Sequence, residues 1–235
     1  MPGAERNSER AQLISPNDET KPSFMNLISN ISAFVFILII TYCCFKNGIS
    51  LFSFHPILMS VGWLILMTSA VNAITPGDLA TEWMPIRLRS ARHWVIQVFT
   101  IIIILIGFLI ILSNKIINGK DHFVTLHGKF GLTSFIFMIV TSFGGLGALY
   151  SLKLKHYIAP LYTKILHSSI GILTFSLGII TIILGCFSNW WNASGNGDVL
   201  RYISIVLVLI TMLLTILRPS LKVYFRIKER LGCSN

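Results

Sequence analysis

Acidic residues are scarce in this chain of 235 residues, which has nine Asp and Glu against nineteen Lys and Arg. Charged residues make up only 12% of the sequence and hydrophobic residues 54%. A soluble globular domain carries about a quarter charged residues, so this composition excludes a soluble enzyme. A net charge of +10 would suit nucleic acid only on a polar basic domain. The chain has no such domain, and we expect no nucleic-acid partner.

Cysteine is also rare, and its four occurrences do not form a recognisable framework. They are Cys43, Cys44, Cys186 and Cys233. Small secreted proteins held by disulfides show an even pattern of spaced cysteines, whereas three of these four lie in or beside apolar runs. We interpret them as structural or incidental residues.

Six long apolar runs dominate the chain. A bilayer core about 30 Å thick needs roughly 20 apolar residues per helix, and the runs that meet this length are approximately 24–45, 54–74, 94–113, 124–149, 164–187 and 199–217. They predict an all-α fold, a six-helix transmembrane bundle over residues 24–218. Residues 1–23 would form an N-terminal tail and residues 219–235 a basic C-terminal tail. A mixed-charge stretch precedes the first run, which predicts a retained helix rather than a signal peptide.

The basic residues indicate an orientation. The two tails and the second and fourth connections hold fourteen Lys and Arg, and the opposite side holds five: Lys46, Lys115, Lys120, Lys129 and Arg201. Basic residues near helix ends prefer the cytosolic side, so we expect both termini in the cytosol. The sequon Asn192-Ala193-Ser194 then lies on the side where glycosylation occurs.

One histidine recurs near the head of each of the four central spans: His55, His93, His127 and His167. Successive helices run in opposite directions, so His55 and His127 approach the non-cytosolic face. For the same reason His93 and His167 approach the cytosolic face. A lone imidazole at this depth has the alternative interpretation of a side chain that snorkels to the headgroups. Four in register favour two functional layers of two histidines.

Two facing histidines without a carboxylate or thiolate suit few metal centres. Zinc asks for four ligands and a di-iron site would bring glutamates, but the second to fifth runs contain no Asp or Glu. Haem asks the protein only for axial ligands, because the porphyrin supplies four nitrogens. A Cys-x-x-Cys-His motif is absent. We therefore expect two non-covalent b-type haems in the central four helices, suited to electron transfer rather than oxygen activation.

Small residues follow two of the histidines at helical spacing. They are Gly131, Ser134, Met138, Ser142 and Gly145 after His127, and Gly171, Thr174, Gly178 and Gly185 after His167. Such residues let a flat macrocycle approach the backbone, but they also line ordinary contacts between membrane helices, and both interpretations stay open. The similar separations of His55 from His93 (38) and His127 from His167 (40) indicate a duplicated hairpin. Each haem would take one ligand from each copy.

This arrangement resembles the cytochrome b561 family of transmembrane reductases, and the short tails resemble its small domain-containing subgroup. The resemblance covers approximately residues 24–218 and rests on His55-Pro56, Arg92-His93-Trp94, Leu126-His127-Gly128 and Leu166-His167-Ser168. The family pairs its second helix with the fourth and its third with the fifth. By this likeness His55 and His127 are the axial ligands of the non-cytosolic haem, and His93 and His167 those of the cytosolic haem.

The resemblance also implies an activity: an ascorbate-dependent transmembrane oxidoreductase. Cytosolic ascorbate would be the donor, and monodehydroascorbate radical or ferric iron the acceptor across the membrane. The subgroup likeness implies the endoplasmic reticulum or a vesicle membrane rather than the plasma membrane. Two alternatives stay open, a haem-containing subunit that exchanges electrons with quinone or a partner protein and, less favoured, a haem-free transporter. The first and sixth spans would pack outside the haem bundle and face lipid or a second copy in a homodimer.

Six basic residues are candidates for binding the ascorbate monoanion. Arg87, Arg89 and Arg92 precede His93, and Lys153, Lys155 and Lys164 precede His167. Basic loops on this side are expected anyway from the positive-inside bias. Better-known members carry lysines three and seven residues before the third-span histidine, where this chain has Ser90 and Ile86. Their Ser-Leu-His-Ser-Trp segment is here Thr125-Leu126-His127-Gly128-Lys129.

Overall fold

The computed structural model describes residues 24–75, 78 and 83–230, and within these ranges all regular structure is helical. Six helices are long and apolar enough to cross a bilayer, as predicted. In hydrocarbon every backbone N–H and C=O needs a partner within the chain, and a helix provides one for each. The predicted tail 1–23 lies outside the described residues.

The helices follow one another in a simple order. They are α2 (Phe24–Phe45); a second span built of α3 (Leu51–Ser60), the π-helix η1 (Val61–Leu66) and α4 (Met67–Ala73); then α5 (Ile86–Ile117), α6 (Leu126–Leu149), α7 (Pro160–Cys186), the short α8 (Asn189–Ala193) and α9 (Asp198–Arg230). The π-helix lies in the middle of the second span, five residues after Pro56. Such wide turns are uncommon and often occur at functional sites.

Four helix ends differ from the prediction by four residues or more. Helix α5 runs from Ile86 to Ile117 rather than from about 94 to 113, α7 begins at Pro160 rather than near 164, and α9 continues to Arg230 instead of ending near 217. Hydropathy marks only the lipid-embedded part, whereas Arg and Lys are good helix formers that extend a helix into water. The extensions place Arg89, Arg92 and Lys164 on helices rather than in loops, and the first part of the C-terminal tail is helical.

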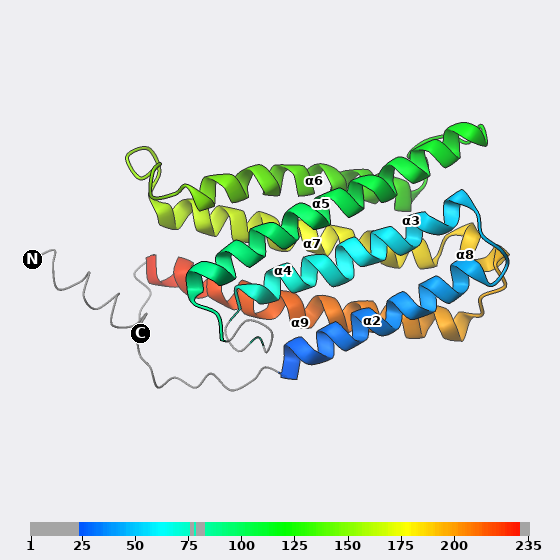
Figure 1. Ribbon diagram of the computed structural model, residues 1–235, viewed down its shortest axis with the longest axis horizontal. Coiled ribbons are helices and arrows are strands. Elements are labelled where there is room, and N and C mark those ends of the chain that lie inside the picture. Colours follow the sequence, from blue (N-terminus) through cyan, green and yellow to red (C-terminus); the bar gives the residue numbers. More distant parts are fainter. Residues whose placement is uncertain (1–23, 76–77, 79–82, 231–235) are drawn as a thin grey trace, which may run out of the picture.

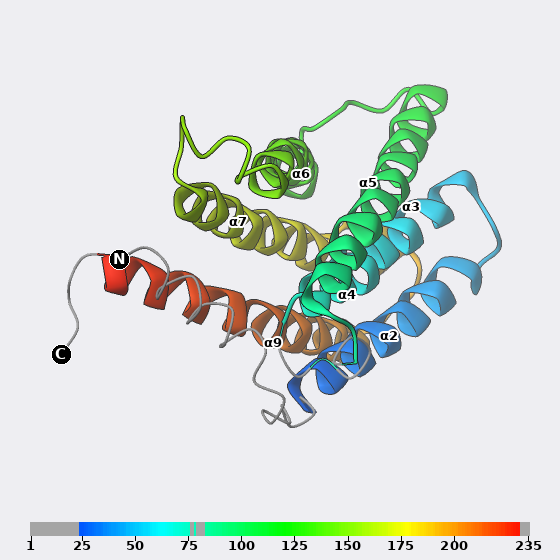
Figure 2. The same ribbon diagram turned by 60° about the vertical axis from the view of Figure 1, so that its left-hand side comes forward.

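The four central spans form two hairpins. Helix α5 packs against α3, η1 and α4, and α6 packs along α7. Figure 2 shows these as two separate pairs, with α6 and α7 on one side and α5 with the second span on the other. This is the duplicated hairpin that the histidine spacing predicts.

The outer helices α2 and α9 do more than face lipid, which is all that hydropathy led us to expect of them. They pack against each other, α9 also packs against α7, and α2 against α3. In their most apolar stretches 39% of α2 is buried, compared with 17% of α5 and 11% of α6. Phe36 of α2 and Val208 of α9 belong to the same buried core as Phe175 of α7. Hydrogen bonds add to this packing, because Ser29 Oγ lies 3.0 Å from Thr215 Oγ1.

The two ends of the bundle differ in charge. Helices α2, α5 and α7 begin at one end, where α4, α6 and α9 finish (Figure 1). We call this the basic end because it carries Arg89, Arg92, Lys153, Lys155, Lys164, Arg218, Lys222, Arg226 and Lys228. The opposite end carries Lys46, Lys115, Lys120, Lys129 and Arg201. That the basic end faces the cytosol stays a prediction.

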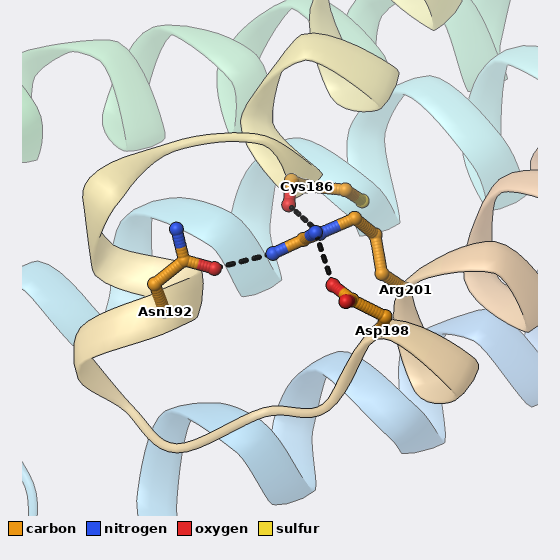
Figure 3. A network of polar contacts seen from close by, with 4 residues as sticks. All are labelled: Cys186, Asn192, Asp198 and Arg201. Carbon is orange, nitrogen blue, oxygen red and sulfur yellow. Dashed lines mark hydrogen bonds and ion pairs between the residues drawn. The ribbon is translucent and has the colours of Figure 1, made fainter.

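Arg201 joins three helices at the opposite end. Its Nε donates to the Cys186 carbonyl at the end of α7 (3.0 Å), and its Nη1 lies 2.5 Å from Asp198 Oδ1 at the start of α9. Nη2 donates to Oδ1 of Asn192 in α8, the asparagine of the sequon. Figure 3 shows the guanidinium at the centre of these three partners. The single cation thus ties the α7–α8–α9 connection together.

Candidate functional site

The four histidines of the central spans form two facing pairs. At the opposite end His55 of α3 faces His127 of α6, with ring centres 6.3 Å apart and ring planes at 86°. At the basic end His93 of α5 faces His167 of α7 at the same 6.3 Å, with planes at 82°. Each pair takes one imidazole from each hairpin. The partners are 72 and 74 residues apart in the sequence, so only the packing of the hairpins brings them together.

Backbone carbonyls hold three of the rings through Nδ1. The distances are 3.0 Å from His55 to Gly107 O, 2.7 Å from His93 to Ala70 O and 2.9 Å from His127 to Thr181 O. A carbonyl oxygen can only accept a hydrogen bond, so Nδ1 carries the proton in each case. The second nitrogen, Nε2, then keeps its lone pair. This tautomer is the one that metal-binding histidines adopt when their outer nitrogen is held by a carbonyl.

The carbonyl acceptors follow the symmetry of the hairpins. Ala70 and Gly107 lie on the two halves of the first hairpin, so His93 of α5 bonds to α4 and His55 of α3 bonds to α5. In the second hairpin His127 of α6 bonds to α7. His167 Nδ1 is buried and has no hydrogen-bond partner among the described residues, although the Thr141 backbone on α6 lies close enough to act on it.

Ala70 is well suited to hold His93. It lies in the last turn of α4, where carbonyls lack a partner within the helix. The Ile74 N–H that would ordinarily reach it bonds instead to Val71 and Asn72. His93 therefore satisfies an orphan carbonyl at the same time as it is oriented by it.

Two glycines make room for the imidazoles. A Cβ on Gly145 would lie 3.2 Å from His167 Cε1, and a Cβ on Gly185 would lie 3.3 Å from His127 Cε1. Gly131 and Gly171 face Thr181 and Thr141 across the same α6–α7 contact. These four glycines therefore take part in close contacts between α6 and α7 and with the imidazole rings.

The chemistry of the pairs limits what they can hold. Within the described ranges, no group of three or more His, Cys, Asp or Glu side chains gathers to bind a bare ion. A metal on two imidazoles therefore needs further ligands from a macrocycle. Metal–imidazole bonds of about 2 Å, as at zinc sites, place two opposed ring centres about 6 Å apart, since a ring centre lies about 1 Å behind its nitrogen. The observed 6.3 Å fits one metal between each pair.

Comparison with known families shows to which family the chain belongs. The family model described as eukaryotic cytochrome b561 matches residues 54–192, which include all four histidines. The chain belongs to the cytochrome b561 family. Membership implies b-type haem as the cofactor and electron transfer within a membrane as the activity, and the facing histidines fit that cofactor.

Curated cytochrome b561 relatives agree with this assignment. The chain is 31% identical to transmembrane reductase CYB561D2 of Mus musculus over 169 residues, which cover 72% of this chain and 75% of the relative. The Homo sapiens protein of the same name is 32% identical over the same length and shares. Probable transmembrane reductase CYB561D1 of Mus musculus is 24% identical over 65% of this chain and 66% of its own. The chain is therefore a transmembrane reductase of the cytochrome b561 type, an oxidoreductase.

The basic residues proposed from the sequence lie at the end that holds His93 and His167. Arg89 is partly buried and its Nε donates to the Met84 carbonyl (2.8 Å), so this cation is already engaged. Lys153, Lys155 and Lys164 are exposed, with Lys153 5.3 Å from the Tyr150 ring centre. Arg92 is half-buried one position before His93. The Arg87 side chain lies outside the described part of the chain.

Two features of this cytochrome b561 were not predicted from the sequence. The first is the set of carbonyls that orient the rings, and no sequence signal could have revealed them, since every residue has a carbonyl. The second is a cluster of cations on α9 beside α7. The charges of Arg226 and Lys164 act on Lys222, so the cations of the two helices lie together. The i, i+4 spacing of Arg218, Lys222 and Arg226 was the available signal.

Proposed function

We propose that this cytochrome b561 carries two haems and passes electrons from cytosolic ascorbate to monodehydroascorbate radical or ferric iron across the membrane. His93 and His167 would be the axial ligands on the cytosolic side, and His55 and His127 those on the other side. The observation that carries the proposal is the pair of facing imidazole sets, each 6.3 Å between ring centres. When bound, haem supplies a one-electron iron couple.

The chain's own residues would hold and shield the two centres. Nδ1–H donation to the Gly107, Ala70 and Thr181 carbonyls fixes ring orientation and raises the basicity of Nε2. Two imidazoles bound to one haem iron would leave no open position for dioxygen or substrate, so the group would serve electron transfer. Along the second span fifteen residues separate His55 from Ala70, and at 1.5 Å per residue this places the two layers about 22 Å apart along the helix.

The donor would bind at the basic end. Arg92 and Lys164 flank His93 and His167 on α5 and α7, and Lys153 and Lys155 lie in the connection before α7. A cluster of positive charge raises the local concentration of an anion such as ascorbate. By the positive-inside bias, this charge supports a cytosolic location for both termini. Likeness to the CYB561D2 subgroup supports a membrane of the endoplasmic reticulum or of vesicles.

Haem content and reducibility test the assignment. Purified wild-type protein should contain two b-type haems per chain by the pyridine haemochrome assay. His93→Ala or His167→Ala should remove one haem and abolish reduction by ascorbate, because the entry point for electrons is lost. His156→Ala, in the exposed connection at the same end, is the matched control and should behave as wild type. Wild-type protein without haem after haem-supplemented expression, or unchanged ascorbate reduction in both variants, would refute the proposal.

Sealed vesicles separate the proposed reductase from the alternative of a quinone-linked subunit. Ascorbate supplied at the basic end should reduce a ferric chelate on the opposite side in the absence of quinone and of any second protein. A requirement for added quinone, or a partner chain that co-purifies and restores transfer, would favour the alternative. Ascorbate supplied only to the opposite side should give much slower reduction.

A further inference from the structure

Trp63 lies between the two hairpins, and its ring packs so closely on α7 that the residue opposite it must be a glycine. The indole is 3% exposed and lies in the π-helix η1. A Cβ on Gly178 of α7 would come within 2.2 Å of Cε3 and 2.5 Å of Cδ2 and Cζ3. No side chain tolerates such distances, so the six-membered ring of the indole lies directly on the α7 backbone.

This contact joins the hairpins in the middle of the bundle. Apart from the histidine pairs near the two ends, the main contact between the two hairpins is made by η1 against α7. Helix α6 packs mainly on α7, and α5 on the second span. Trp63 belongs to a buried core shared with Met138 of α6 and Ile104 of α5. The indole therefore sets how closely the hairpins approach.

Trp63 also lies midway between the two layers of histidines. It follows His55 by eight residues and precedes Ala70, the acceptor for His93, by seven. At 1.5 Å per residue these separations are about 12 Å and about 10 Å along the helix. A π-turn accommodates one residue more than an α-turn, which turns the following residues about the helix axis. In this span the wide turn coincides with the residue that faces the second hairpin.

We propose that Trp63 is the positioning residue of this reductase, the spacer that holds the two histidine pairs at haem-binding distance and the aromatic path between the two centres. The inference rests on the proposed two-haem function. One electron leaves the reduced centre at the basic end and arrives at the oxidised centre at the opposite end. The indole loses neither an electron nor a proton, and its packed atoms let electrons tunnel faster than they would across the void left by a smaller side chain.

Four variants and one control test this role. Gly178→Ala inserts a methyl group into the indole site. Gly147→Ala, on the facing helix α6, is the control, because a Cβ at this position would meet nothing within 4 Å. Trp63→Phe keeps an aromatic ring of smaller size, and Trp63→Leu removes aromaticity. Combining Trp63→Leu with Gly178→Ala relieves the clash and shows whether the two residues act through their contact.

The first readouts are haem per chain and the melting temperature of the protein prepared without haem. We expect Gly178→Ala to lower both quantities, Gly147→Ala to leave both unchanged, and the double variant to recover haem content. The second readout is the rate of electron transfer between the centres after rapid reduction from one side. With both haems bound, Trp63→Phe should retain most of this rate. Trp63→Leu should lower the rate by about an order of magnitude, both alone and in combination with Gly178→Ala.

Two outcomes would overturn the inference. One is a Gly178→Ala protein that matches Gly147→Ala in haem content and melting temperature. The other is wild-type transfer in Trp63→Leu or, if that variant does not fold, in the double variant, with both haems in place. Either result leaves the two-haem function standing. Wild-type protein without two haems would instead remove the proposed function itself, so the two failures are distinguishable.

Discussion

At the scale of single residues, the site depends on the histidines and also on the backbone carbonyls that orient their rings. An imidazole in a membrane helix has two nitrogens to satisfy, and a carbonyl of the neighbouring helix takes one of them at His55, His93 and His127. That bond decides which nitrogen is free for a metal. Gly145 and Gly185 complete the arrangement, because a Cβ at either position would lie in tight contact with an imidazole ring, at 3.2 Å and 3.3 Å.

Alanine at either glycine should damage one centre and spare the other. In Gly185→Ala the new methyl group would press on the His127 ring at 3.3 Å, and in Gly145→Ala on the His167 ring at 3.2 Å. Overpacking of this kind costs about 1–3 kcal/mol. We expect each variant to lose one haem of two, the one at the opposite end for Gly185→Ala and the one at the basic end for Gly145→Ala. Absorbance and electron paramagnetic resonance spectra would identify the centre that is lost.

Gly147→Ala serves as the control for this pair, because a Cβ at Gly147 meets nothing within 4 Å. It should retain both centres. Equal haem loss in all three variants would show that the glycines serve the general folding of α6 and α7 rather than the individual rings.

At the scale of elements, the helix ends carry contacts that hydropathy does not reveal. Arg201 at the start of α9 bonds to the last turn of α7 and to α8, so one side chain sets the geometry of the connection after the fifth span. Its side chain is 11% exposed, compared with 73% for Asp198. The hydrogen bonds to Cys186 and Asn192 therefore contribute more to stability than the exposed ion pair with Asp198, because an ion pair in water contributes little.

Arg201→Gln should lower stability, since it removes charge-assisted hydrogen bonds worth about 1.5–3 kcal/mol each. We expect a clear fall in melting temperature in detergent and an unchanged haem spectrum in the protein that remains folded. Lys120→Gln removes an exposed charge at the same end and should melt as wild type does. Equal melting of the two variants would contradict a structural role for the Arg201 junction.

At the scale of the whole molecule, two histidine layers lie toward opposite ends of a six-helix bundle. An electron that passes between them moves charge across part of the membrane. Displacing one charge across a full bilayer changes its energy by about 2.3 kcal/mol per 100 mV. The proposed reductase would therefore be electrogenic, and its rate would depend on the potential between the two compartments.

Vesicles with an imposed potassium diffusion potential test this dependence. With ascorbate at the basic end, a potential negative on the ascorbate side should speed reduction of an acceptor on the other side, because it drives negative charge away from the donor. The reversed potential should slow it. Vesicles held at zero potential with ionophores provide the baseline. Identical rates under all three conditions would mean that the charge movement is compensated or absent.

The sequence alone determined the number of spans, the all-helical class and the register of the four histidines. Lipid forces long apolar runs into helices, and alternating direction assigns each histidine to an end. Hydropathy does not specify how a nearly all-apolar helix is rotated about its axis, and contacts between helices depend on that rotation. Only the tertiary structure therefore decided the carbonyl partners of the histidine rings, the packing of Trp63 on Gly178 and the burial of α2 between its neighbours. It also decided the helical continuation of α9, because polar turns gain their helicity from propensity and packing rather than from lipid.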